Sequence, residues 1–474
     1  MVPRRRGARL GPVAATPRSV ARADEQAWIQ GGTQEALGAG AAHAPRDRYV
    51  DALRVGSLLV VVLGHWLMGG VDGEGRVTNA LAAVTWLQPL TWVLQVMPLF
   101  FLVGGIAHTY ALDSLHGRGG TTRGRYAAFV RTRAGRLLRP TVAFLVVWLV
   151  LGLVAHAVGL ADVPLVETAL RLVPQLLWFV GIYLGVAALA PAMHRAHRRW
   201  GGRVVVVLVL AAVAVDLARF AAGVGVLATV NFALVWLALH QLGFCWRDGA
   251  LTHRVAAALA GGGLLSLVLL VTLGPYPVSM VGLPGESISN MAPPTVALLA
   301  QGIALVGCAV LLRGPATRLL ARPAAWRAVM VAGSLAMTTF LWHLTALFVA
   351  VLVLSSVGIE LPVAGTGTWW ATRPLWLGGL ALATLPLVGA LRRFDAPRPS
   401  PSGRLDETRR LPGVLAATGA ALAVLGVLMV SVSGVDVVAG SAVRFVAVDV
   451  TPGVALAVLA TGCALMAAAR PVRR

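Results

Sequence analysis

The stretch Tyr49-Val-Asp51-Ala-Leu-Arg54-Val-Gly-Ser-Leu-Leu-Val-Val-Val-Leu-Gly-His65-Trp66 decides the fold of this chain. Its apolar run is long enough for a membrane-spanning helix, which needs about 20 residues. A titratable residue inside such a helix is costly to keep there and therefore marks a functional site by default. On an α-helix the eleven positions from Arg54 to His65 rise roughly 16 Å and rotate within about 20° of three full turns. We therefore expect the two side chains to share one helix face at two depths.

The composition extends this interpretation to the whole chain. Of its 474 residues, 58% are hydrophobic and 12% are charged, whereas soluble domains carry about 25% charged residues. The sequence predicts an all-α fold, a polytopic transmembrane helix bundle with a body of about ten helices and two further helices at the C-terminal end. The expected spans are 49–68, 90–112, 141–159, 172–192, 203–222, 227–246, 254–274, 294–312, 328–354, 372–391, 411–432 and 453–469.

The arginines indicate how the bundle is oriented. The chain has no lysine, so all 40 basic residues are arginine, and the net charge is +21. Most of them fall in alternate connections, as expected for loops on the cytoplasmic side of a membrane. Arg54 lies within a span, and only five arginines fall on the other side: Arg76, Arg171, Arg219, Arg373 and Arg444. This distribution predicts a multi-pass plasma-membrane protein with both termini in the cytoplasm, and it argues against a nucleic-acid partner.

Four segments make up the predicted organisation. Residues 1–47 are rich in Arg, Ala and Gly and read as a disordered cytoplasmic tail. Residues 48–391 form the ten-helix body, 392–410 a Pro/Ser/Arg-rich cytoplasmic linker, and 411–474 a two-helix membrane appendage. The three cysteines stand singly in apolar runs, with no metal-ligand spacing and no disulfide pattern: Cys245, Cys308 and Cys463.

Several motifs, in order along the body, resemble the membrane-bound acyltransferase 3 family. The first-helix signature of that family is an arginine, ten residues and a histidine, which Arg54 and His65 match. The later matches are Met97-Pro-Leu-Phe-Phe-Leu-Val-Gly104-Gly105, the basic run with Arg131, Arg133, Arg136, Arg139 and Pro140, Leu177-Trp178-Phe179 with Pro191, and Phe340-Leu-Trp-His343. Two positions depart from the pattern: Gly104 stands where many members have serine, and Phe340 replaces a tyrosine.

This resemblance implies an enzyme that transfers an acyl group, often acetyl, from cytoplasmic acyl-CoA. The expected acceptors are hydroxyl groups of a sugar, an envelope glycan or a secondary metabolite, so the reaction would be an O-acetylation that modifies carbohydrate of the cell envelope. Acyl-CoA would be a co-substrate, with no permanently bound cofactor and no metal. The expected partners are thus acyl-CoA, a glycan or small-molecule acceptor, and the lipid bilayer.

Two histidines are candidates for the proton chemistry. An alcohol is a poor nucleophile until a base removes its proton, and histidine titrates near neutral pH. We expect His65 to act as the general base or to carry the acyl group briefly; the structural alternative is an interhelical hydrogen bond. His343 lies at a similar depth in another helix running the same way, so both side chains are expected to face one central cavity.

Four arginines are candidates for binding the donor. Arg54 follows Asp51 by about one turn, so it either forms an intrahelical salt bridge or anchors the phosphates or thioester end of CoA. Arg133, Arg136 and Arg139 are spaced by three residues, which places them along one face of a helix, where guanidinium groups grip phosphate bidentately. The alternative for this basic run is contact with anionic lipid.

Two rival functions fit the same composition. One is a transporter or permease of a cell-envelope intermediate, because buried charged residues serve transport as well. The other is an inactive relative that acts as a membrane scaffold, against which the retention of Arg54 and His65 argues weakly.

Overall fold

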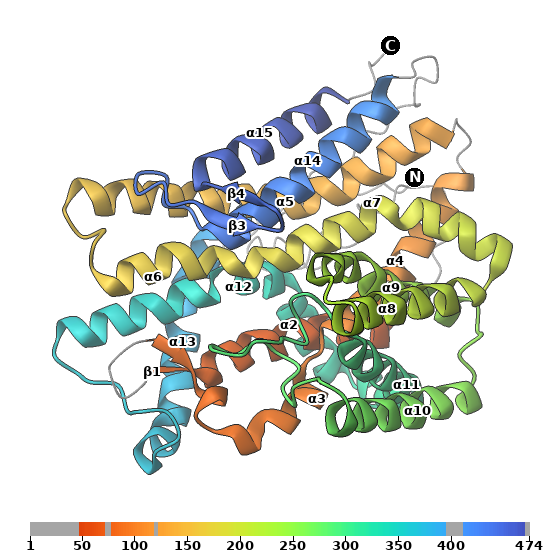
Figure 1. Cartoon of the computed structure of the whole chain (residues 1–474), viewed down its shortest axis with the longest axis horizontal. Helices are drawn as coiled ribbons and strands as arrows, with labels where there is room; N and C mark the ends of the chain where they lie inside the picture. Colours follow the sequence, from red (N-terminus) through yellow and green to blue (C-terminus); the bar gives the residue numbers. More distant parts are fainter. Residues whose placement is uncertain (1–46, 72–76, 118–121, 395–410, 470–474) are drawn as a thin grey trace, which may run out of the picture. The chain divides into compact units, whose positions relative to one another are not determined.

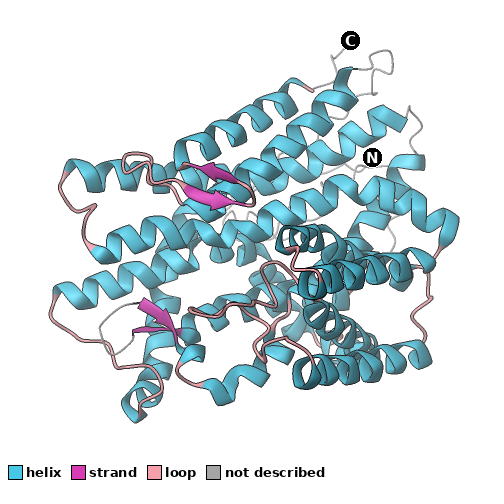
Figure 2. Ribbon diagram, viewed as in Figure 1, coloured by secondary structure: helices cyan, strands magenta, loops and turns pink. Residues whose placement is uncertain are grey.

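The computed structural model describes residues 47–71, 77–117, 122–394 and 411–469, and these are mostly helical (Figures 1 and 2). The α-helices are α2 (Arg48–Met68), α3 (Thr91–Leu94), α4 (Met97–Gly117), α5 (Thr122–Ala157), α6 (Pro164–Leu172), α7 (Leu177–Trp200), α8 (Arg203–Ala221), α9 (Asn231–Arg247), α10 (His253–Leu273), α11 (Val296–Leu320), α12 (Pro323–Ser356), α13 (Gly367–Leu391), α14 (Leu411–Ser433) and α15 (Pro452–Ala468). Short 3-10 turns cover Ala80–Ala82, Thr85–Leu90, Val173–Leu176, Gly225–Val230 and Arg392–Phe394. Two small antiparallel hairpins complete the fold, β1 (Gly69–Val71) with β2 (Val77–Asn79) and β3 (Val443–Phe445) with β4 (Val448–Val450).

The predicted all-α membrane bundle is confirmed. Within the described residues, eleven helical segments are long and apolar enough to cross a membrane, and α15 is a shorter apolar helix of 17 residues. The protein is therefore a multi-pass membrane protein. The largest difference from the predicted boundaries is at α5, which begins at Thr122 and not near residue 141. The basic run that was expected to precede this span is itself helical, since its spacing and its long side chains suit a helix that leaves the bilayer.

Successive helices connect alternately at two ends of the bundle. At one end, Arg48 Nη1 donates to the carbonyl of Leu320, which ties the start of α2 to the end of α11. At the other end, Trp92 Nε1 donates to the carbonyl of Val278, which ties the start of the α3–α4 segment to the chain after α10. We call the first the arginine-rich end, because the segments 193–203, 247–254 and 313–327 lie there, each made of helix ends and the turn between them.

Glycines bring two central helices into backbone contact. Gly105 on α4 and Gly243 on α9 face each other, and a Cβ atom on Gly105 would collide with the carbonyl of His240. Small residues that let backbones approach are the usual means of packing helices in lipid, where no hydrophobic effect drives their association. The second glycine of the Gly104-Gly105 pair therefore serves the α4–α9 crossing.

The C-terminal helices pack directly on the body. Gly181 on α7 lies against Leu428 on α14, and Gly426 on α14 lies against Leu459 on α15. Their separation as an appendage stays a prediction. Most of the predicted linker and nearly all of the predicted N-terminal tail lie outside the described residues.

The connection from α10 to α11 is held in place at the end opposite to the arginine-rich one. Asn290 Nδ2 donates to the carbonyls of Pro277 and Ser279, and its Oδ1 accepts from the hydroxyl of Thr295. Burial and the neighbouring Asp216 carboxylate raise the pKa of Tyr276, whose hydroxyl donates to Asp216. The segment is thus a fixed cover at this end.

Candidate active site

The two predicted histidines meet between α2 and α12. His65 Nδ1 lies 2.8 Å from His343 Nε2, and the rings stack with centroids 5.0 Å apart at an angle of 15°. His343 is fully buried, whereas His65 is exposed. One member of the pair is therefore held by the protein while the other remains accessible.

A second hydrogen bond determines which nitrogens carry protons. His343 Nδ1 lies 2.6 Å from the carbonyl oxygen of Phe340, which can only accept, so His343 Nδ1 carries the proton. In a neutral ring Nε2 of His343 is then an acceptor, and His65 must donate to it from Nδ1. The lone pair of His65 is left on Nε2, the nitrogen that points away from the pair and can take a proton.

Tryptophans fix the backbone around the histidine pair. Trp66 Nε1 donates to the carbonyl of His343 at 3.0 Å, and Trp376 Nε1 donates to the carbonyl of Trp66 at 2.9 Å. These bonds join α2, α12 and α13, which also lie side by side in Figure 1. The orientation of His65 thus rests on bonds among three helices.

A cluster of cations lies toward the arginine-rich end of the same site. Arg54 on α2 and Arg136 on α5 are close enough to repel each other, and both are exposed. Arg133 interacts with Arg136 and with the hydroxyl of Tyr183 on α7, which also interacts with Arg54. Asp51 lies 3.4 Å from Arg54 and is the only carboxylate that the described residues pair with it. The cluster therefore keeps an excess of positive charge, as an anion site requires.

Arg139 has a different environment from the other two arginines of its run. Its Nη2 donates to the carbonyl of Arg393 at the end of α13. The structure thus brings Arg54, Arg133 and Arg136 together, whereas Arg139 ties α5 to α13. The salt bridge predicted as the alternative role of Arg54 is present, but it leaves Arg54 within the cationic cluster.

A series of contacts between aromatic rings runs from the cationic cluster to the histidine pair. Centroid distances are 5.9 Å from Tyr183 to Phe179, 5.5 Å from Phe179 to Phe340 and 5.9 Å from Phe340 to His343. Both Phe179 and Phe340 belong to the motifs that the sequence analysis singled out. Phe179 and Phe340 are buried, so these ring contacts pack α7 against α12 between the cationic cluster and the histidine pair.

Comparison with known families identifies the family to which this chain belongs. The model of the acyltransferase 3 family, described as an acyltransferase domain, matches residues 47–393. The chain belongs to the acyltransferase 3 family. The match covers all the residues of the site, from Arg54 to His343, and the protein is a membrane O-acyltransferase. Searches of the curated proteins and of the solved structures found no match.

Sequence reasoning missed Tyr183 in this acyltransferase. The side chain is partly buried, and the hydroxyl has no hydrogen-bond partner among the described residues although Arg133 lies nearby. A Cβ atom on Gly104 would lie 2.9 Å from this hydroxyl and 2.8 Å from Cε2 of the same ring. Tyr183 thus fills the space that a serine at position 104 would need, and the departure from the family motif was the signal that pointed to it.

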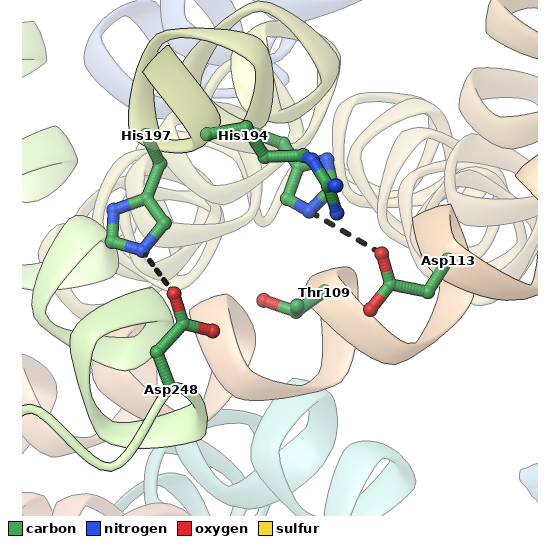
Figure 3. Close-up of a pocket in the computed structure, with 6 residues that line it drawn as sticks. Thr109, Asp113, His194, His197 and Asp248 are labelled. Carbon is green, nitrogen blue, oxygen red and sulfur yellow. Dashed lines mark hydrogen bonds and ion pairs between the residues drawn. The ribbon is translucent and has the colours of Figure 1, made fainter. Parts of the chain in front are cut away.

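A polar cavity lies at the arginine-rich end, apart from the predicted residues (Figure 3). It measures about 310 Å³ and is lined by Thr109, Asp113, His194, His197, Arg198 and Asp248. His197 Nε2 lies 2.9 Å from Asp248, and His194 Nε2 lies 3.5 Å from Asp113. Among the described residues no group of three or more His, Cys, Asp and Glu side chains is arranged to hold a metal ion, here or elsewhere.

The contact between Gly104 and Tyr183 gives the first prediction. Gly104→Ala is expected to displace Tyr183 and to lower stability by about 1–3 kcal/mol, as overpacking of a filled site does. In a Tyr183→Ala background the same Gly104→Ala substitution should cause no further fall in melting temperature, because the ring that it displaces is absent. Gly56→Ala is the matched control, because nothing lies within 4 Å of its added Cβ. A melting temperature of Gly104→Ala equal to that of Gly56→Ala would contradict the close contact.

Proposed function

We propose that this acyltransferase moves an acyl group, in the first instance acetyl, from cytoplasmic acyl-CoA to a hydroxyl of a sugar, an envelope glycan or a secondary metabolite. The observation that carries the proposal is the free lone pair on His65 Nε2, which follows from the chain of bonds through His343 to the carbonyl of Phe340. A base held by a second group that sets its tautomer is the arrangement used to activate a hydroxyl nucleophile.

The proposed reaction balances with His65 as the only proton carrier. His65 Nε2 takes the proton of the acceptor hydroxyl while its oxygen attacks the thioester carbonyl carbon. The tetrahedral intermediate then collapses, the carbon–sulfur bond breaks, and the CoA thiolate receives the proton from His65 Nε2. His343 Nε2 accepts from His65 Nδ1 throughout and thereby stabilises the imidazolium that exists between the two proton transfers.

The donor's charged end fits the cationic cluster. CoA carries a diphosphate and a 3′-phosphate, and Arg54, Arg133 and Arg136 offer guanidinium groups for bidentate contacts. The thioester would have to reach His65 over a distance of about 16 Å along α2. Acyl-CoA is a co-substrate in this scheme, and no permanently bound cofactor is needed.

The charge distribution supports the orientation of the reaction. The arginine-rich end is the one at which Arg54, Arg133 and Arg136 gather, and such ends face the cytoplasm in membrane proteins. We therefore place both termini in the cytoplasm and the protein in the plasma membrane. Acyl-CoA would arrive from the side on which it is made.

The proposal is tested by following the acyl group. Purified protein in proteoliposomes is supplied with [1-14C]acetyl-CoA and extracts of envelope glycans and metabolites, and labelled products are identified by mass spectrometry. The same products should be missing from a deletion strain and return when the wild-type gene is restored. Absence of any labelled acceptor, with folded protein present, would refute acyl transfer from CoA.

The cationic cluster gives a second prediction. Arg54→Ala and Arg136→Ala are each expected to raise the KM for acetyl-CoA by about tenfold, because each removes one charge-assisted contact of about 1.5 kcal/mol. The matched control is Arg318→Ala, an exposed arginine near the end of α11. Initial rates of thiol release over a range of acetyl-CoA concentrations give KM and kcat separately. Equal KM values for Arg136→Ala and Arg318→Ala would place the phosphates elsewhere.

A further inference from the structure

Arg373 is a buried cation at the end of the bundle opposite to the arginine-rich one. It lies on α13 and is 6% exposed. Its Nε donates to the carbonyl of Trp369 at 3.1 Å, and its Nη1 donates to the carbonyl of Gly69 at 3.3 Å. The guanidinium group also lies over the ring of Trp369, at 4.5 Å, and near that of Trp376, at 5.4 Å. The charge is thus held by two carbonyls and two indole rings.

This charge has no carboxylate partner among the described residues. The structure pairs Arg373 only with the two carbonyls and the rings, and its Nη2 has no acceptor there. A second donor beside it is also unused, because the indole N–H of Trp369 is buried without a partner. A buried cation costs several kcal/mol unless it is paired. Donors therefore exceed acceptors here, and an acceptor-rich anion would correct the imbalance.

The position of Arg373 relates it directly to the histidine pair. Gly69, whose carbonyl it binds, is the residue that ends α2, and the N–H of Gly69 bonds to the carbonyl of His65. The guanidinium thus lies about one helical turn beyond His65, or roughly 6 Å along the axis. Arg54 lies on the opposite side of His65, toward the arginine-rich end. The general base has a cationic site on either side of it.

Capping of a helix end accounts for only part of this arrangement. Arginine commonly donates to the last carbonyls of a helix and interacts favourably with its dipole, and the bond to Gly69 does this. Arginine has five N–H groups, of which the two carbonyls take two. The remaining N–H groups, on Nη1 and Nη2, form the fork that binds carboxylate or phosphate.

We propose that Arg373 binds an anionic group of the acceptor, a carboxylate or a phosphate, and holds the acceptor hydroxyl toward His65. This inference rests on the proposed function, since it concerns the second substrate of that reaction. The donor phosphates occupy the cluster around Arg54 and the acceptor anion occupies Arg373. The two charged ends are thereby kept apart, and the reacting groups meet at the histidine pair between them.

The test compares acceptors that differ in one group, which is neutral in one member of each pair and anionic in the other. Wild-type protein in proteoliposomes receives [1-14C]acetyl-CoA and one member of two matched pairs, methyl β-glucoside with methyl β-glucuronide, and glycerol with glycerol 3-phosphate. We expect kcat/KM to be at least tenfold higher for the anionic member of a pair. The ratio within a pair does not depend on how much of the enzyme is active. Neutral acceptors that are used as well as anionic ones, or no transfer to any of the four, would overturn the assignment.

Variants at position 373 separate binding from a structural role. Arg373→Gln should lower the preference for the anionic acceptor by about tenfold without changing the KM for acetyl-CoA, and Arg373→Lys should keep part of it. The anionic member should also raise the melting temperature of the wild type in the absence of acetyl-CoA, and not that of Arg373→Gln. If Arg373→Gln changed transfer to both members of a pair equally, Arg373 would serve only to hold α13 against α2.

One further variant concerns carboxylates near β1 in the sequence. Asp72 and Glu74 lie outside the described residues, and Asp72→Asn with Glu74→Gln removes both charges. Retention of the preference for anionic acceptors in this double variant supports the proposal. Loss of that preference, with the same drop in melting temperature as Arg373→Gln, would show that Arg373 forms an internal ion pair with one of these two carboxylates. That result would overturn the proposal. Failure of acyl transfer with every acceptor, in extracts as well as in the matched pairs, would instead refute the proposed function.

Discussion

Replacing His65 with alanine is expected to lower the rate of acyl transfer by about 10²–10⁴-fold, the contribution of a positioned general base. The variant removes the only nitrogen of the histidine pair that has a free lone pair, Nε2 of His65. His343 Nε2 also has a lone pair, but it lies behind the place of the His65 ring on a fully buried side chain, so we do not expect it to reach the acceptor. The hydroxyl of the acceptor would then keep its proton.

The loss should fall on kcat and leave the KM for acetyl-CoA near its wild-type value, because the proposed phosphate site at Arg54 is about 16 Å away along α2. His253→Ala is the matched control, since His253 is an exposed histidine at the start of α10. Melting temperature and gel-filtration profile show whether each variant is folded. Wild-type activity in folded His65→Ala would rule out His65 as the base.

The same assay distinguishes the base from a covalent carrier. If His65 carried the acyl group, incubation with [1-14C]acetyl-CoA without acceptor would label the wild type in a hydroxylamine-sensitive bond, and the label would be lost in His65→Ala. If His65 is the base, as we propose, the protein stays unlabelled and both substrates must be bound before thiol is released.

The bundle was predictable because lipid restricts the choices of the chain. Only helices satisfy every backbone polar group inside a bilayer, so apolar runs of sufficient length translate into spans. All twelve predicted spans coincide with helices. The predicted start of the third span was wrong. The basic run from Arg131 to Arg139 belongs to the same helix, but it lacks the apolar signal on which span boundaries depend.

The site was only partly predictable because periodicity describes one helix at a time. It places Arg54 and His65 on α2, but the 2.8 Å contact of His65 with His343 depends on how α2 and α12 pack. The spacing of the basic run does not separate Arg139 from Arg133, since the difference arises from the end of α13. The sequence does not show that Arg373 is buried or that it has no carboxylate partner among the described residues. Its position outside the arginine-rich connections was the one visible sign.

His343 gives the second large effect, and here the substitution tests the chain of bonds. His343→Ala removes the acceptor for His65 Nδ1–H, so His65 loses both its fixed tautomer and the group that stabilises its imidazolium. A hydrogen bond to a charged group contributes about 1.5–3 kcal/mol, which corresponds to a fall in kcat of up to about 100-fold. The KM for acetyl-CoA should change little, because Arg54 and Arg136 are untouched.

A glutamine at position 343 provides the matched variant. Its amide oxygen can occupy the place of Nε2 and accept from His65, so His343→Gln should recover a large part of the activity that His343→Ala loses. The double variant His65→Ala, His343→Ala should be no slower than His65→Ala alone, because His343 acts only through His65. Additive losses in the double variant, or equal rates for alanine and glutamine at position 343, would show that His343 contributes packing and not the orientation of the base.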